Sequence, residues 1–165
     1  MVVALALARQ PDRSAFLTKL SGTERNIADY LAEDVLDHLP QEQQLFLDQT
    51  SVLDEFCAEL CNALTGRRDG LDLLMRLQRE QLFVIPLDEQ GEWFRYHHLF
   101  AEFLQGRLAR RGDKAALLNA AARWCEARDL PDRAIKYALR GRDYSFAAEM
   151  LERQGARLIA GNRVY

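Results

Sequence analysis

Two adjacent histidines, His97 and His98, are the residues of this sequence best suited to hold an anion. They stand where a predicted helix begins, and the free backbone N–H groups of a helix N-terminus already favour an anion. An imidazole N–H in the first turn adds a further donor, and the nearby Arg95 can pair with a phosphate through its forked guanidinium. The alternative is structural: one histidine caps the helix, the other packs on Trp93 or Phe94, and Arg95 forms a surface ion pair.

Two cysteines, Cys57 and Cys61, are four residues apart and therefore share a helical face. Such a pair suits two ligands of a metal ion. No second pair of ligands stands nearby to complete a tetrahedral site, so we interpret both as thiols of the hydrophobic core and predict no metal site.

The motifs of common enzyme classes are missing from the sequence. No Gly-x-Ser-x-Gly elbow joins its Ser, His and Asp residues, which argues against a hydrolase. No Gly-Lys pair occurs, so the phosphate-binding loop Gly-x-x-x-x-Gly-Lys-[Ser/Thr] is also missing. We therefore expect that this chain by itself is not an enzyme and binds neither ATP nor ADP with useful affinity.

Charge is distributed unevenly along the 165 residues, whose net charge is -3. Residues 1–104 carry 9 basic and 18 acidic side chains, whereas residues 105–165 carry 13 basic and 7 acidic ones. The acidic first part argues against unaided DNA binding, which depends on neutralising phosphates. The first predicted helix carries an acidic run that is either a docking face or a solvated one, namely Asp29, Glu33, Asp34 and Asp37. The basic side chains of the second part alternate in sign with acidic ones, as on solvated helical faces.

The three cysteines are too few for a disulfide framework, and neither a signal peptide nor a membrane-spanning run is visible. We therefore expect a cytoplasmic protein without contact to a membrane.

Hydrophobic periodicity and turn residues predict a mainly α fold. The order of helices followed by a β-hairpin is typical of a winged-helix module, with the last helix packing beneath the wing. Trp93, Tyr96 and Phe100 are then expected to be largely buried where the wing meets the helices. The predicted elements are helices over about 24–39, 40–50, 57–66 and 71–81, strands at 82–87 and 93–96, and a helix over 97–112.

Beyond Gly112 the pattern changes to helix hairpins of the α-solenoid type, rich in alanine at close-contact positions. One predicted helix contains Leu117 to Cys125, the next begins at Pro131, and Asp143 caps the third. So short a solenoid leaves one apolar face uncovered, so we expect the chain to be part of a longer protein.

Several stretches resemble the large MalT-like regulators of the LuxR family, and together they cover nearly the whole chain. They are Leu20–Gly22, Ile27–Leu36, Thr50–Leu53, Leu60–Gly66, Leu82–Asp88 and Trp93–Phe100. Members of that family are signal-transducing ATPases with an ATP-binding domain, a helical segment, a winged helix, a tetratricopeptide-like superhelical sensor and a C-terminal DNA-binding helix-turn-helix. The resemblance implies that residues 1–22 end the helical segment, 23–111 form the winged helix and 112–165 begin the sensor.

The resemblance also implies a role for the histidines. Related nucleotide switches carry a winged-helix Met-His-Asp motif whose histidine holds the phosphate of ADP in the inactive form. Tyr96-His97-His98-Leu99 is similar to that motif, with His98 in place of the Asp, so His97, His98 and Arg95 are the expected nucleotide-binding residues. The implied cofactor of the full-length protein is ADP or ATP, held by the nucleotide-binding domain of the same chain.

Three functions remain open at this point. In the first, the chain is a regulatory relay that couples nucleotide state to the sensor, where an inducer or regulatory protein binds, and DNA is bound only through a domain outside this chain. In the second, the winged helix itself binds DNA with Leu71–Gln81 as recognition helix, although Asp72 and Glu80 offset Arg76 and Arg79 there. In the third, the helix hairpins are a protein-interaction scaffold to which nucleotide is irrelevant.

Overall fold

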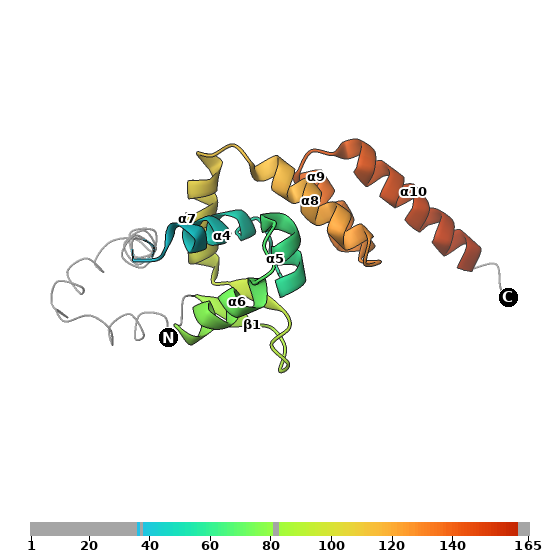
Figure 1. The fold of residues 1–165 in the computed structure, drawn as a ribbon. Helices are drawn as coiled ribbons and strands as arrows, with labels where there is room; N and C mark the ends of the chain where they lie inside the picture. Colours follow the sequence, from blue (N-terminus) through green and yellow to red (C-terminus); the bar gives the residue numbers. More distant parts are fainter. Residues whose placement is uncertain (1–35, 37, 81–82, 162–165) are drawn as a thin grey trace.

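The computed structural model describes residues 36, 38–80 and 83–161. These form a mainly α structure in which a winged helix is followed by further helices that extend away from it, as Figure 1 shows. The predicted fold class is thus confirmed, while most of the predicted helix over 24–39, with its acidic run, lies outside the described residues. The elements are α4 (Gln41–Thr50), α5 (Ala58–Thr65), α6 (Gly70–Arg79), β1 (Val84–Pro86), β2 (Phe94–Tyr96), α7 (His98–Ala109), α8 (Lys114–Glu126), α9 (Pro131–Arg140) and α10 (Tyr144–Gly161).

The wing is an antiparallel hairpin in which Val84 pairs with Tyr96 and Pro86 with Phe94. Phe56, which precedes α5, pairs with Phe94 from the other side, and each backbone N–H donates to the other residue's carbonyl at 2.8 Å. Phe56 thus adds an isolated β-bridge at the edge of the two-stranded sheet. The sequence analysis missed this bridge, because one residue has no period to recognise.

The ends of the helices follow the punctuation of the sequence. Pro40 stands immediately before α4, and Gly66 ends α5 in the left-handed conformation with φ of 70°, which glycine adopts without strain. Pro131 is the first residue of α9. Asp143 caps α10, because its Oδ1 accepts the backbone N–H of Phe146 at 3.2 Å.

A continuous hydrophobic core joins the winged helix to the helices that follow it. Tyr96 and Phe100 are buried in this core as predicted, and the Tyr96 hydroxyl forms a buried hydrogen bond of 2.7 Å with Thr50. Trp93 is less deeply buried than these two residues and packs against the same core. Its ring is also covered by the guanidinium of Arg133, 4.2 Å from the ring centroid.

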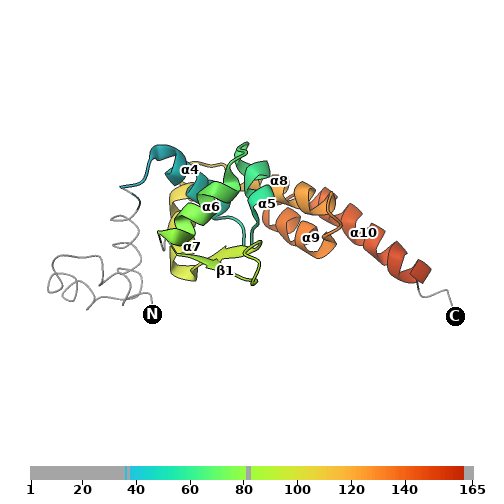
Figure 2. The same ribbon diagram turned by 60° about the horizontal axis from the view of Figure 1, so that its bottom comes forward.

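Helices α8, α9 and α10 pack on one another in sequence, and α8 also packs on α5 of the winged helix (Figures 1 and 2). The end of α9 approaches α8 closely at Gly141, where a Cβ would lie 2.0 Å from Oδ1 of Asn119 and 3.2 Å from Cβ of Leu118. The proposed boundary between residues 111 and 112 stays a prediction, as does the assignment of residues 1–22, which lie outside the described part. None of the described helices is long and apolar enough to cross a membrane.

Candidate functional site

The three predicted nucleotide-binding residues lie close together along the chain at the edge of the wing. Arg95 is an exposed residue of β2, His97 is the half-buried residue that precedes α7, and His98 is exposed at the first position of α7. The two imidazole rings are in contact, with centroids 4.5 Å apart. The fold therefore presents both histidines at a helix N-terminus.

The backbone of His97 is held from both sides. Its N–H donates to the carbonyl of Phe83 at 2.8 Å, and its own carbonyl accepts the N–H of Ala101 at 2.9 Å. Phe83 has a φ of 59°, a left-handed conformation that costs energy in a bulky residue. The ring of Phe83 stacks on that of Phe100 at 4.9 Å, which fixes the strained residue against the core. Phe83 is thus a supporting residue that the sequence analysis missed, since nothing in its type indicates a positive φ.

Partial burial lowers the pKa of His97 below the ordinary value of an imidazole, and the neighbouring His98 and Arg95 lower it further. A neutral imidazole at neutral pH offers one N–H donor and one acceptor. An incoming phosphate would reverse this effect, because a negative charge beside the ring favours its protonated form.

The particular contacts that the structural alternative named are not seen in the described part of the chain. Neither histidine forms a side-chain cap on α7, and the ring of His97 contacts His98 and not an aromatic residue of the wing. Arg95 has no hydrogen bond or ion pair there, although the sequence analysis allowed a surface ion pair. The arrangement is chemically suited to an anion, and its occupancy by a nucleotide stays a prediction.

The cysteines are core residues, as expected. Cys61 is fully buried and Cys57 partly so, and burial raises the pKa of both thiols. Among the residues that the structure describes, no group of three or more His, Cys, Asp or Glu side chains is placed to hold a metal ion.

A second set of charged residues, which we call the junction, joins the winged helix to α8 and α9. It comprises Asp54, Glu55 and Glu59 on the winged helix and Arg128, Arg133, Lys136 and Arg140 on the other side. Asp54 contributes most: Nη1 of Arg140 donates to both of its carboxylate oxygens at 3.0 Å, and Lys136 lies 2.8 Å away. The backbone N–H of Asp54 also donates to the hydroxyl of Tyr137 at 3.3 Å.

The rest of the junction combines ion pairs with an aromatic contact. Arg133 bonds Glu55 through Nη2 while its guanidinium lies over Trp93, and Arg128 bonds Glu59 at 2.7 Å. The sequence analysis interpreted the basic second part as solvated faces. The structure adds to that interpretation: these residues remain partly exposed, and they also pair with the acidic edge of the first part.

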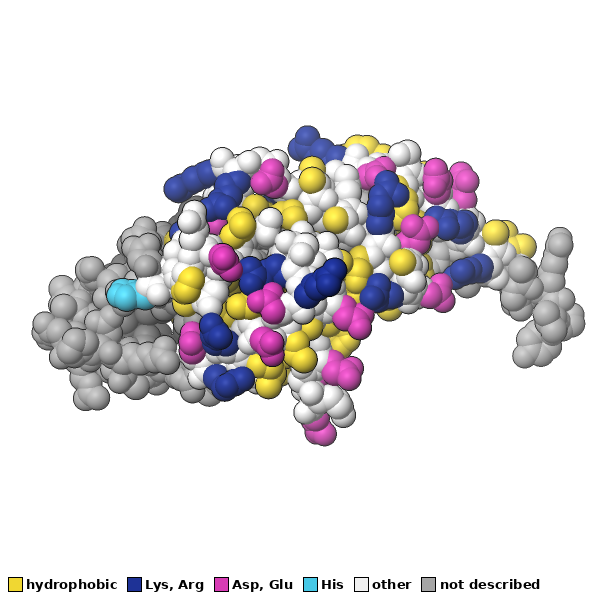
Figure 3. Space-filling view, in the orientation of Figure 1, with side chains coloured by type: hydrophobic (Ala, Val, Ile, Leu, Met, Phe, Trp, Pro, Cys, Tyr) yellow, Lys and Arg dark blue, Asp and Glu magenta, His cyan; other side chains and the backbone are white. Residues whose placement is uncertain are grey.

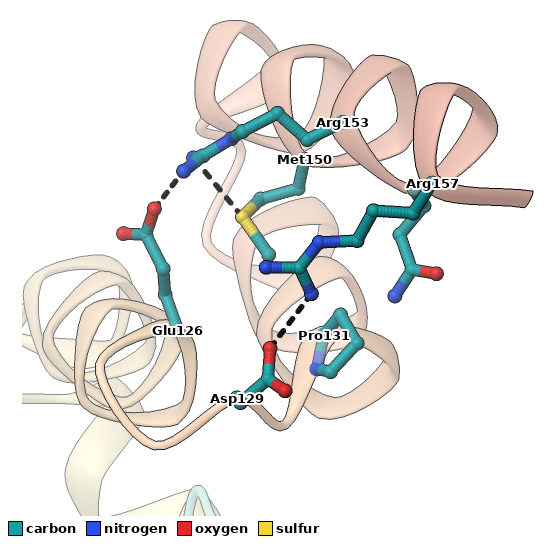
Figure 4. Close-up of a pocket in the computed structure, with 7 residues that line it drawn as sticks. Glu126, Asp129, Pro131, Met150, Arg153 and Arg157 are labelled. Atoms are coloured by element: carbon teal, nitrogen blue, oxygen red, sulfur yellow. Dashed lines mark hydrogen bonds and ion pairs between the residues drawn. The ribbon is translucent and has the colours of Figure 1, made fainter. Parts of the chain in front are cut away.

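The one cavity that we describe lies at the other end of the molecule, between the α8–α9 turn and α10 (Figure 4). It measures about 60 Å³ and is lined by Glu126, Asp129, Pro131, Met150, Arg153, Gln154 and Arg157. Its charges are matched, since Arg153 pairs with Glu126, and Arg157 with Asp129 at 2.8 Å. None of the predicted site residues lines it.

A family model described as the MalT winged helix domain matches residues 32–116, more than half of the chain. The chain belongs to the MalT winged helix domain family. The resemblance found in the sequence is thereby confirmed, and the matched range contains Arg95, His97 and His98.

Several curated relatives are similar over most of this chain. The HTH-type transcriptional regulator MalT of Vibrio campbellii is 43% identical over 134 residues, which cover 79% of this chain and 15% of the relative. The regulator of the same name from Serratia proteamaculans is 38% identical over 157 residues, covering 91% of this chain and 17% of the relative. The serine/threonine-protein kinase PknK of Mycobacterium tuberculosis is 33% identical over 159 residues, covering 95% and 14%. The chain thus spans about one sixth to one seventh of the length of the relatives it matches.

Proposed function

We propose that this member of the MalT winged helix family is the regulatory relay of an ATP-dependent, LuxR-family transcriptional regulator. Its winged helix contacts ADP or ATP on a nucleotide-binding domain of the same protein. A tetratricopeptide-like sensor that begins at residue 112 receives the change and binds an inducer or regulatory protein. DNA is bound by another domain of the same protein.

The observation that carries the proposal is the position of α7. This helix starts beside the two histidines and leads into α8, and its 12 residues span about 18 Å. Asp48 of α4 fixes it in place: this fully buried carboxylate accepts a hydrogen bond of 3.0 Å from Nε–H of Arg107 in α7. Because α7 is held by such contacts and the junction ties α8 and α9 to the same body, a displacement at the histidines is transmitted to the helices that follow.

The histidines supply the nucleotide contact in this proposal. His97 donates a hydrogen bond to a phosphate oxygen of ADP, and His98 and Arg95 add positive potential beside it. A hydrogen bond to a charged group contributes roughly 1.5 to 3 kcal/mol. A contact of that size, made in only one of two states, shifts their ratio about ten- to a hundredfold.

DNA binding by the winged helix itself is the weaker candidate. The turn of the wing carries Asp88, Glu89 and Glu92, where a DNA-binding wing needs cations to contact phosphates. Similarity extends over 79% of the chain to a relative named as a transcriptional regulator and over 95% to one named as a protein kinase. A segment common to both supports a relay, or the interaction scaffold that remains the third candidate, over a reader of DNA bases.

The test is His97→Ala in the full-length regulator that contains this chain. We expect signal-independent transcription to rise about tenfold or more and ADP affinity to fall by a similar factor, because the resting state loses its phosphate contact. His98→Ala should have a smaller effect. Arg142→Ala, at an exposed arginine of the α9–α10 turn, is the matched control and should change neither quantity.

If folded His97→Ala protein keeps its basal transcription and its ADP affinity, the relay loses its nucleotide contact, and the scaffold becomes the better interpretation. If the winged helix alone binds duplex DNA in a salt-dependent manner, the second candidate replaces the first.

A further inference from the structure

The outward face of α6 combines exposed apolar side chains with arginines. Leu71 and Met75 follow each other after one helical turn and are 54% and 37% exposed, whereas Leu74 and Leu77 on the opposite face are buried. Arg79 extends the same row by a further turn, since residues four apart lie one above the other on a helix. We call this row, with Arg76 beside it and Arg68 just before the helix, the α6 face.

The arginines of the α6 face differ from most others in the molecule. In the part of the chain that the structure describes, Arg68, Arg76 and Arg79 form no hydrogen bond or ion pair, although all three are exposed. The adjacent Arg67, by contrast, is bonded to Asp69 through two nitrogens at 2.7 Å. No described residue occupies the donors of these three guanidinium groups, which can therefore pair with an external carboxylate.

The composition of this face is that of a protein-binding surface. Arginine and methionine are enriched at protein interfaces, and a methionine adapts its shape to an apolar partner. Two apolar side chains at i and i+4 are the anchors by which helices recognise each other. Figure 3 shows Lys and Arg side chains interspersed with apolar and acidic ones over the region where Figure 1 places α6.

DNA fits this surface less well. If α6 lay in a DNA groove, its apolar row would occupy the centre of the groove, and Asp72 would face the DNA phosphates. The protruding tip of the wing also carries acidic side chains, which phosphates would repel (Figure 3). We therefore propose that the α6 face binds an acidic amphipathic helix of a partner protein. Its apolar stripe packs on Leu71 and Met75, and its carboxylates pair with Arg68, Arg76 and Arg79. This proposal does not depend on the nucleotide relay, because α6 carries none of the nucleotide-binding residues.

The test measures binding of a fluorescein-labelled probe to the chain by fluorescence anisotropy. The probe is an 18-residue designed helix with Leu at i, i+3, i+4 and i+7 and Glu on its other face, and a control peptide has Lys in place of every Glu. We expect saturable binding of the acidic peptide and at least tenfold weaker binding of the basic one.

Two double variants locate the binding to the α6 face. Leu71→Ala/Met75→Ala and Arg76→Gln/Arg79→Gln should each weaken binding at least tenfold, and both keep good helix-forming residues at exposed positions. The matched control is Arg110→Gln/Arg142→Gln, which removes two other exposed arginines without an ion pair in the described residues and should leave the affinity within twofold. Circular dichroism verifies that all three remain folded.

The proposal is overturned if the acidic peptide does not bind, if both peptides bind equally, or if the control variant loses as much affinity as the α6 variants. It is also overturned if a 20-base-pair duplex binds more tightly than the acidic peptide and Arg76→Gln/Arg79→Gln abolishes that binding, because the face then recognises nucleic acid.

Discussion

The charged side chains on two sides of the winged helix are used in different ways. Toward α8 and α9, Asp54, Glu55 and Glu59 are each paired with a cation from the second half of the chain. At the start of α7, the neighbouring Arg95 and His98 have no ion pair among the described residues. At the junction, opposite charges pair with each other and hold the structure together. At the start of α7, the hydrogen-bond donors of Arg95 and His98 are available to a ligand. The comparison therefore separates a structural contact from a candidate binding site.

The largest expected effect tests the core residue that supports the start of α7, where the histidines lie. Phe100 is buried one turn behind His97, stacks on Phe83 at 4.9 Å and meets the ring of Tyr96 edge-on at 5.8 Å. Phe100→Ala should lower the free energy of unfolding by about 3 to 5 kcal/mol, as measured by urea denaturation. A loss below about 1 kcal/mol would mean that the wing is peripheral to the core, and the histidines would then lack a rigid support.

The second effect concerns the attachment of α6. A Cβ at Gly70 would lie 2.6 Å from Oδ1 of Asn62, which accepts the Gly70 N–H, and 2.9 Å from the backbone carbonyl of Ala58. Gly70→Ala should therefore cost about 1 to 3 kcal/mol, because a backbone atom cannot move aside as a side chain can.

The matched control for that substitution is Gly106→Ala on α7, where a Cβ meets nothing within 4 Å. It should raise stability by about 0.4 to 1 kcal/mol, since alanine restricts the unfolded chain and favours a helix. Equal effects of the two substitutions in thermal denaturation would contradict the close packing of α5 on α6.

A smaller effect is expected from removing one arginine of the junction. Arg133→Ala removes both the ion pair with Glu55 and the cation–π contact with Trp93. Partly exposed interactions of these kinds contribute about 0.2 to 1 kcal/mol each, so the total loss should be about 0.4 to 2 kcal/mol and should shrink in high salt. The control Arg142→Ala removes an exposed arginine that has no such contact with any described residue, and stability should change by no more than about 0.5 kcal/mol.

The junction would be of no structural importance if these two variants lost the same stability in urea denaturation at low salt. A double-mutant cycle of Arg133 and Glu55 measures the interaction between these two residues directly, and a coupling energy different from zero would show that they stabilise the junction together.

The smallest effect is the pH response of His97. Its pKa is lowered in the folded protein, so the unfolded chain takes up the proton first as the pH falls. The contribution of His97 to stability is therefore complete above the unfolded pKa near 6.5 and is lost as the pH falls through the folded pKa. His97→Gln should flatten the dependence of unfolding free energy on pH in the acidic range below about 6.5.

An NMR titration of the His97 ring measures the same shift directly. A midpoint at or above the value of an unfolded reference peptide would show that the ring is more solvated than the structure indicates. Addition of ADP to the full-length regulator should move the midpoint upward if a phosphate approaches the ring.

Much of this architecture was predictable from the sequence because it depends on neighbours in the chain. Periodic apolar residues predicted the helices, and punctuation by Pro131, Gly66 and Asp143 placed their ends. The sequence also predicted that a helix begins at the two histidines, and α7 begins at His98. Their contact with a nucleotide stays a prediction.

The tertiary structure alone decided the contacts between distant residues. Arg128 and Glu59 are separated by 69 positions, and Arg140 and Asp54 by 86, so no local pattern could show that the basic second part neutralises the acidic first part. The β-bridge between Phe56 and Phe94 and the cation–π contact of Arg133 with Trp93 also join residues far apart in the sequence. Local propensity depends on residues a few positions apart, whereas pairing across the fold depends on which surfaces the packed core brings together.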